Sequence, residues 1–233
     1  MKYISIVAVI FLATACNNGK RGSGNIITET RNVSTFTKVS AATSIDVDVQ
    51  QGAETSVIVE ADDNLIKYVE TKIEGGELKI RLKNISIRND ATIKVHIVAP
   101  RYEGFSASSS AEITSKNTIT SSSNIKLKAS SSANIDMQID APSVDVDASS
   151  SADITASGRT KEITVDASSS ALVELNKLQA ETATAKASSS ADVSIFASIK
   201  VNAKASSSAD IKYTGGAADV VKSESSSGTI TKQ

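Results

Sequence analysis

The sequence predicts an all-β protein, a right-handed parallel β-helix (β-solenoid) with coils of about 19 residues and ladders of serine and alanine. Three observations predict this fold. The pentapeptide ASSSA recurs from residue 107 onward, the residues around it alternate between apolar and polar side chains, and the composition favours strands. Only 3% of the 233 residues are aromatic, and Ser, Thr, Ala, Val and Ile predominate, which is typical of strands that pack small side chains.

The spacing of the pentapeptide excludes a flexible serine-rich linker. From Ala129, successive copies begin 19, 19, 20 and 18 residues apart, and the related ESSSG at Glu224–Gly228 follows 19 residues later. A fixed period near twenty residues is typical of a solenoid in which each repeat forms one coil. The six copies begin at Ala107, Ala129, Ala148, Ala167, Ala187 and Ala205.

The stretch VDASSSADI, from Val146 to Ile154, alternates as a strand with one buried face does. If the strand continues through the triplet, the central serine shares the face that carries every aliphatic side chain. We therefore expect the central serines to be buried between closely spaced walls, where each hydroxyl group bonds to those of the adjacent coils. This predicted internal ladder consists of Ser131, Ser150, Ser169, Ser189 and Ser207.

Two further features of the repeat carry positional predictions. One column on the outer surface is expected to read Lys128, Asp147, Asp166, Lys186, Lys204, with mixed charges as on a solvated face. A degenerate copy, TSSSN at Thr120–Asn124, lies too close to Ser130 to fit the period. We expect its serines, Ser121–Ser123, on a different wall of the same coil.

The chain is expected to have three parts. Residues 1–16 resemble a lipoprotein signal peptide: the apolar run from Tyr3 to Ala15 is shorter than the roughly 20 residues of a membrane-spanning helix, and Cys16 follows it. Cys16 is the only cysteine, and acylation would remove its free thiol; an ordinary signal peptide is the alternative. Residues 17–25 are expected to form a flexible tether.

Residues 26–233 then form a single domain. Residues 26–104 lack serine triplets but alternate like strands, and we expect them to form wider coils or a cap over the solenoid's first edge. Residues 105–230 form the coils with serine triplets. The protein is therefore expected to be exported to the cell envelope as an outer-membrane lipoprotein.

Residues that could carry catalysis or bind a metal are few. His96 is the only histidine and lies on the polar face of its strand, so neither a Ser-His-Asp triad nor a zinc site is expected. No calcium-binding Gly- and Asp-rich repeat is present, and we predict no metal and no cofactor. A net charge of -1 argues against a nucleic-acid partner.

Several segments together resemble the head GIN domain family. They are the G-x-G-N opening at Gly22, an F-x-x-V strand, DVDVQQG, ADDNL and GGELKI, followed by serine-rich coils. That family is labelled an auto-transporter adhesin and is common in exported proteins of Bacteroidetes. The resemblance implies a β-helical fold and an exported, often lipid-anchored, location, and it implies no catalytic residues.

The expected function is that of a non-enzymatic envelope lipoprotein, a binding, adhesion or scaffold module attached to the membrane through Cys16. Its partner is expected to be a glycan, peptidoglycan or another envelope protein. One alternative is a carbohydrate-active β-helix enzyme that uses carboxylates on a strand face, such as Asp145 and Asp147. The other is a purely structural envelope spacer.

Overall fold

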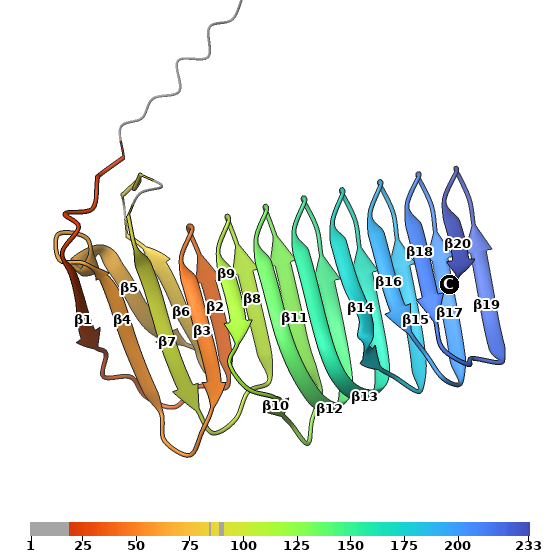
Figure 1. The fold of residues 1–233 in the computed structure, drawn as a ribbon, viewed down its shortest axis with the longest axis horizontal. Coiled ribbons are helices and arrows are strands. Elements are labelled where there is room, and N and C mark those ends of the chain that lie inside the picture. Colours follow the sequence, from red (N-terminus) through yellow and green to blue (C-terminus); the bar gives the residue numbers. More distant parts are fainter. Residues whose placement is uncertain (1–18, 84, 89–90) are drawn as a thin grey trace, which may run out of the picture.

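The computed structural model describes residues 19–83, 85–88 and 91–233, so the predicted signal peptide and Cys16 lie outside the described residues. The described chain forms one elongated stack of β-coils (Figure 1). This β-solenoid confirms the predicted fold class. One short 3-10 helix, η1 (Ile66–Tyr68), is the only helix in the described ranges, and none there is long and apolar enough to cross a membrane.

The stack has two walls of strands, which are parallel from β2 and β3 onward and which are joined at two edges. In stacking order, the first wall contains β5 (Val69–Glu74), β6 (Glu77–Leu82), β2 (Lys38–Ala42), β8 (Gly104–Ser108), β11 (Ile125–Ser130), the second halves of β12 (Asn134–Ala148) and β13 (Asp153–Ala167), β15 (Thr182–Ala187), β17 (Lys200–Ala205) and β19 (Asp219–Glu224).

The second wall faces the first across the core. It contains β1 (Ile26–Thr30), β4 (Ser56–Asp62), β7 (Ile93–Ala99), β3 (Asp46–Gln51), β9 (Glu112–Ser115), the first halves of β12 and β13, β14 (Leu172–Gln179), β16 (Asp192–Phe196), β18 (Asp210–Thr214) and β20 (Thr229–Lys232). The short β10 (Ile119–Thr120) pairs with β12 where this wall ends.

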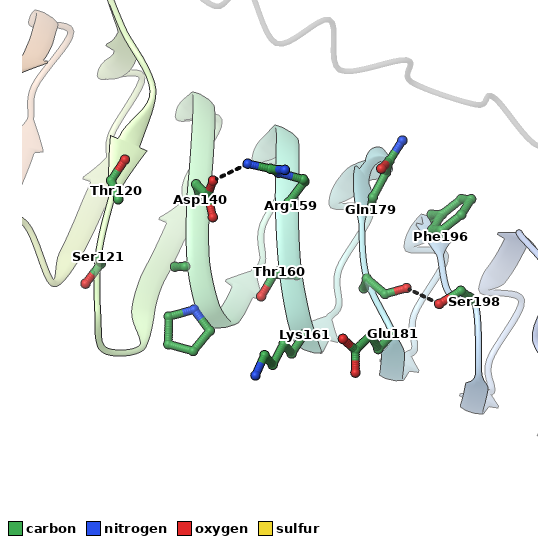
Figure 2. A pocket seen from close by; sticks show the side chains of 13 residues that line it. Thr120, Ser121, Asp140, Arg159, Thr160, Lys161, Gln179, Glu181, Phe196 and Ser198 are labelled. Atoms are coloured by element: carbon green, nitrogen blue, oxygen red, sulfur yellow. Dashed lines mark hydrogen bonds and ion pairs between the residues drawn. The ribbon is translucent and has the colours of Figure 1, made fainter.

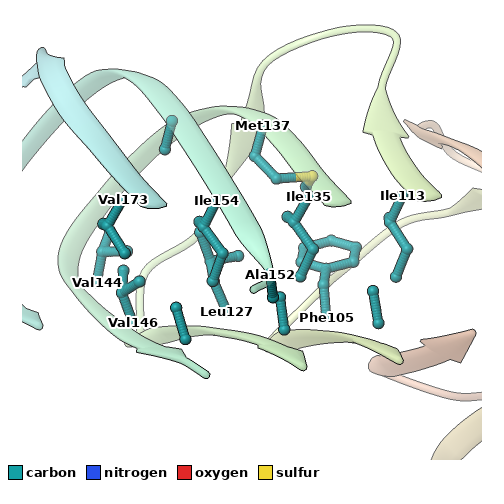
Figure 3. Close-up of a cluster of buried hydrophobic side chains, with 14 of the residues drawn as sticks. Phe105, Ile113, Leu127, Ile135, Met137, Val144, Val146, Ala152, Ile154 and Val173 are labelled. Atoms are coloured by element: carbon teal, nitrogen blue, oxygen red, sulfur yellow. The ribbon is translucent and has the colours of Figure 1, made fainter. Parts of the chain in front are cut away.

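The register between coils places equivalent residues of the repeat on top of one another. Asn134 pairs with Asp153, and Ala148 with Ala167, each 19 positions apart. The alternating aliphatic residues all point inward, as Figure 3 shows for Ile113, Ile135 and Ile154 in neighbouring coils. The predicted outer column from Lys128 to Lys204 is confirmed by the same pairings.

The prediction that the central serines are buried is wrong. All five are exposed: Ser131, Ser150, Ser169, Ser189 and Ser207. The strand does not continue through the triplet, because the second and third serines adopt left-handed backbone angles, with φ of 54° at Ser150 and 58° at Ser151. The amide of Ala152 donates to the carbonyl of Ser149 at 3.3 Å, which closes a tight turn with positive φ at both central residues, the type I′ geometry.

We call each of these features a serine turn, and together they form the serine edge, the row of narrow loops along the top of Figure 1. After this two-residue turn the side chain of the next residue points to the core again. The alanines on both sides of the triplet are therefore buried, as Ala148 and Ala152 are. Thr43 and Ser44 form the same turn between β2 and β3, although no serine triplet marks it.

Neighbouring serine turns are joined by backbone hydrogen bonds in both directions. The amide of Ser132 donates to the carbonyl of Ser150 in the next coil at 3.0 Å, and the amide of Ser149 donates to the carbonyl of Ala129 in the previous coil at 3.0 Å. Left-handed angles are unfavourable for residues other than glycine. The bonds to both adjacent turns offset that cost in every coil.

Ser121–Ser123 lie elsewhere, as the broken period predicts. They follow β10 at the corner edge, where each coil passes from the second wall to the first, and the amide of Ser121 donates to the carbonyl of Asp140 at 3.0 Å. None of the three has positive φ. They therefore belong to the edge opposite the serine turns rather than to a wall.

The N-terminal region both continues the stack and caps it. β2 and β3 form an ordinary parallel coil, whereas β1, β4, β5, β6 and β7 include the antiparallel pairs β1–β4, β4–β7 and β5–β6. At this end Leu65, directly before η1, and Ile66, its first residue, are buried, and Ile66 packs with the main hydrophobic core. The antiparallel strands and this apolar plug cover the first coil, the role expected for a solenoid cap.

The segment expected to be a flexible tether is held by this cap over the residues that are described, from Gly19 onward. The amide of Gly24 donates to Asp62 Oδ1 at 2.7 Å, and the hydroxyl of Ser23 donates to Asp63 Oδ1 at 2.6 Å. The ammonium of Lys20 donates to the hydroxyl of Tyr68 at 2.8 Å.

At the C-terminal end of the stack, charged side chains occupy positions that are alanine in the preceding coil. Lys222 aligns with Ala203, and Glu224 aligns with Ala205. The Lys222 ammonium donates to the carbonyl of Ile230 at 3.0 Å, and Glu224 Oε1 accepts from the amide of Ile230 at 2.6 Å. Inward-pointing charges of this kind discourage another strand from adding to an open edge.

Candidate functional site

A groove at the corner edge, opposite the serine turns, is the candidate site. It encloses about 630 Å³ and crosses the coils from β10 to β16 (Figure 2). This volume lies within the range of small-molecule sites, roughly 300–1,000 Å³. We call it the corner groove, and its lining has two banks and a floor.

The first bank is a column of side chains, one from each coil. The strand register aligns Thr120 with Asp140, Asp140 with Arg159, and Arg159 with Gln179. Arg159 Nη2 binds Asp140 Oδ2 at 2.8 Å, and both side chains remain largely accessible to solvent. The half-buried ring of Phe196, from the end of β16, closes the groove at its C-terminal side (Figure 2).

The floor consists of small buried residues. Ala141, Thr160 and Ala180 follow the first bank by one position in successive coils, and all are at most 9% exposed. The hydroxyl of Ser198 donates to the carbonyl of Ala180 at 3.2 Å. The second bank contains Pro142, Lys161 and Glu181, of which Lys161 and Glu181 are labelled below Thr160 in Figure 2.

Two glycines shape the bank. Gly158, directly before Arg159, has φ of 115°, and a Cβ there would lie 2.1 Å from the carbonyl oxygen of Ile139. Only glycine lets the two coils approach closely enough to set Arg159 beside Asp140. At the other end, a Cβ on Gly215 would lie 3.2 Å from Phe196 Cε2, so glycine also makes room for the ring.

The irregular spacing of the repeat begins on the second wall, a few residues before the groove. The register shifts by one residue between Thr155 and Ser157, where β14 carries a β-bulge, and this is the extra residue of the 20-residue coil. The following coil is one residue shorter than the usual 19, and the regular register returns at Ala205. Bulges often redirect side chains beside functional sites.

The charges of the groove balance, because Asp140 and Glu181 oppose Arg159 and Lys161. The arrangement offers hydrogen-bond donors and acceptors with one aromatic face, which suits binding. Among residues 19–83, 85–88 and 91–233, no cluster of three or more His, Cys, Asp or Glu side chains could hold a metal ion.

The residues considered for catalysis lie away from the groove. Asp145 and Asp147 are on the outer face of the first wall, where Asp145 accepts from Asn124 Nδ2 at 2.7 Å and Asp147 pairs with the Lys128 ammonium at 2.9 Å. His96 lies on the second wall, and its Nδ1 is 3.4 Å from Asp48 Oδ2. The structure therefore does not bring His96 together with the two carboxylates.

Asp48 belongs to a separate ion-pair cluster. Partial burial opposes its ionisation, but the hydrogen bond from Lys116 and the charges of Lys116 and Lys94 lower the pKa of its carboxyl group. The Lys116 ammonium lies 2.9 Å from Asp48 Oδ1. The cluster links charged side chains of neighbouring strands. None of these residues lines the corner groove.

Reasoning from the sequence missed the corner groove, although three signals for it are present. Arg159 is the only arginine within the serine-triplet repeats, and Gly158 interrupts a strand pattern directly before it. The spacing also changes from 19 to 20 and then 18 around the same coils. What the sequence alone does not reveal is that Phe196 and Arg159 line one surface.

Comparisons with known proteins agree with the resemblance in the sequence. A family model described as "Putative auto-transporter adhesin, head GIN domain" matches residues 35–217. No curated protein is similar enough to count as a match.

Three solved structures have the same fold. The chain resembles a "putative adhesin" from Bacteroides fragilis (21% identity, TM-score 0.85, 92% of this chain and 100% of that chain). It also resembles a "putative lipid binding protein" from Parabacteroides distasonis (24% identity, TM-score 0.73, 92% and 99%). A third is a "putative adhesin" from Parabacteroides merdae (16% identity, TM-score 0.71, 92% and 99%). Because the family model covers most of the chain, the protein belongs to the head GIN domain family that this model describes.

Proposed function

We propose that the protein is a non-enzymatic binding module of the cell envelope, anchored by an acyl group on Cys16, which holds its partner in the corner groove. The observation that carries this proposal is the groove itself: polar side chains from four coils and an aromatic ring converge there, beside coils whose length departs from the regular 19 residues. Departures from a regular pattern are expected at functional sites.

The N-terminal contacts support an orientation on the membrane. Only Asn17 and Asn18 separate Cys16 from Gly19, and Lys20 and Ser23 are bound to the cap. A fully extended chain spans at most about 3.6 Å per residue, so this linker keeps the cap within roughly 11 Å of an acylated Cys16. The capped end then lies next to the membrane, and the corner groove is held farther out along the rod.

The family supports a binding role and leaves the partner open among a glycan, peptidoglycan, a lipid or another envelope protein. Asp145 and Asp147 line a second hollow of about 670 Å³ on the first wall. An enzyme that uses them has less support, because each carboxylate already accepts a hydrogen bond from a neighbouring side chain. A purely structural spacer would account for the rod but not for the convergence of polar side chains and an aromatic ring in one groove.

Acylation is tested by growing cells with an alkyne fatty acid and detecting label on the wild-type chain and on Cys16→Ser. We expect label only on the wild type, with Cys16→Ser released from the membrane fraction. Label on both chains, or on neither, would contradict the anchor.

Binding is tested by incubating the purified domain, residues 19–233, with whole cells and envelope fractions and measuring the bound protein. We expect Arg159→Ala to reduce binding at least tenfold. The matched control is Lys128→Ala, which removes an equally exposed ion pair on the first wall. Equal binding by both variants and the wild type would exclude the corner groove as the binding surface.

A further inference from the structure

We infer that the corner groove binds a linear, electrically neutral glycan that lies across the coils, with one sugar ring packed against Phe196. This inference rests on the proposed function and names the ligand class of the same site. It is carried by three properties of the groove: its length, its hydrogen-bonding groups and its balanced charge.

The groove is linear, and each coil contributes one polar side chain to it at an equivalent position. Its first bank presents Thr120, Asp140, Arg159 and Gln179 from consecutive coils. Adjacent strands are about 4.8 Å apart, so the bank, ending at Phe196, extends for roughly 19 Å. A surface that presents one polar group per coil matches a polymer that presents a similar set of groups on each unit.

The polar groups are those that recognise hydroxyl groups. Arg159 Nη2 donates to Asp140 Oδ2 at 2.8 Å, and the remaining N–H groups and carboxylate oxygen can donate to and accept from adjacent hydroxyls at the same time. The side-chain amide of Gln179 can also both donate and accept hydrogen bonds. Both charged side chains are accessible, so a ligand need not break a buried interaction to reach them.

Phe196 supplies the apolar contact. Its half-buried ring stands at one end of the bank, next to Gly215, and points away from the strand in Figure 2. The C–H groups on one face of a pyranose ring pack well against an aromatic ring, because that face is apolar and flat. A single ring at the end of the bank therefore positions a terminal sugar or one sugar of a chain.

Other ligand classes fit less well. A polyanion or polycation would find no net attraction, because two acidic and two basic side chains balance. An extended peptide usually binds by adding a strand, but β12, β13 and β14 already use their backbones in pairing with neighbouring coils. An acyl chain would have to desolvate both polar banks without forming hydrogen bonds.

The test is calorimetric titration of the purified domain with neutral oligosaccharides: hexamers of β-1,4-glucose, β-1,4-xylose, β-1,4-mannose and N-acetylglucosamine. Oligogalacturonate and a polylysine peptide serve as charged comparisons. We expect at least one neutral hexamer to bind, its affinity to change little between low and high salt, and Phe196→Ala and Arg159→Ala to weaken it about tenfold or more, equivalent to about 1.4 kcal/mol.

Two matched controls separate the groove from the remaining surface. Leu172→Ala removes an exposed apolar side chain on the second wall outside the groove, and Lys128→Ala removes an exposed charge on the first wall; both should bind as the wild type does. If no neutral hexamer binds at millimolar concentration, the inference is wrong. If an envelope protein or a charged polymer binds and Arg159→Ala abolishes it, the glycan inference fails while the proposed function stands.

Discussion

The two ends of the rod are closed by different chemistry. At the N-terminal end, antiparallel strands and the buried side chains of Leu65 and Ile66 cover the first coil with apolar material. At the C-terminal end, Lys222 and Glu224 replace inward alanines and bind the backbone of Ile230. A growing stack of identical coils can thus be stopped either by covering its core or by placing charge in line with it.

The largest expected effect of a substitution is at the apolar cap. Leu65→Ala removes a fully buried side chain from the plug, and we expect it to lower the free energy of unfolding by about 2–5 kcal/mol. Urea denaturation followed by circular dichroism measures this loss. A loss below about 1 kcal/mol would show that the plug contributes little and that the antiparallel strands alone close this end.

The serine turns between the two ends should be sensitive to side-chain shape. Ser150→Val places a β-branched residue at a φ of 54°, and we expect a cost of about 1–2 kcal/mol in the same unfolding measurement. Ser150→Gly should be at least as stable as the wild type, because glycine adopts this angle freely. Thr164→Val, on the exposed face of β13, is the control and should be nearly silent; equal effects at both sites would contradict the turn geometry.

The charged end should control association more than stability. The double variant Lys222→Ala, Glu224→Ala restores the alanines of the preceding coil and removes the charges that discourage further pairing. We expect stability to fall by only about 1–2 kcal/mol, because the backbone of Ile230 loses two hydrogen bonds, but we expect concentration-dependent association. Sedimentation velocity measures it; a variant that stays monomeric at every concentration would show that the charges are not the barrier.

The smallest expected effect concerns an exposed ion cluster on the capped end. Hydrogen bonds from Lys72 and Lys79 lower the pKa of Glu74 to about 2. Because the folded pKa is depressed, the cluster stabilises the protein above the unfolded value near 4.3 and loses this contribution as the pH falls toward 2. The gain in stability is small because all three side chains are exposed.

NMR titration of the Glu74 carboxyl group measures this pKa directly. We expect Lys79→Met to raise it toward the ordinary value of glutamate. An unchanged pKa in that variant would show that Lys72 alone holds the charge.

The coils could be predicted from the sequence because the features that define them are local. The spacing of ASSSA gives the coil length, and the alternation around Val146 and Ile154 gives the buried face. The error at Ser150 has a clear cause: a two-residue left-handed turn and a straight strand both return the next alanine to the core. Serine does not mark positive φ as glycine or asparagine would.

The corner groove could not be predicted in the same way, because it depends on how irregular coils align. The extra residue and the missing residue are visible as spacing, but the pairing register alone places the first in β14 and the second between Ile195 and Lys200, on either side of the groove's last coils. Gly158 likewise acts through its contact with Ile139, in the preceding coil. Interactions between coils, rather than within one, define the site.

The serine turn also makes the length of the rod a variable that evolution can adjust by copy number. Each turn offers its neighbours the same amide and the same carbonyl, so an inserted copy of a 19-residue unit meets partners that already fit it. Every added unit lengthens the molecule by about 4.8 Å without any change in the other units. The reach of such a rod is therefore set by the number of units, while the contacts within and between units stay the same.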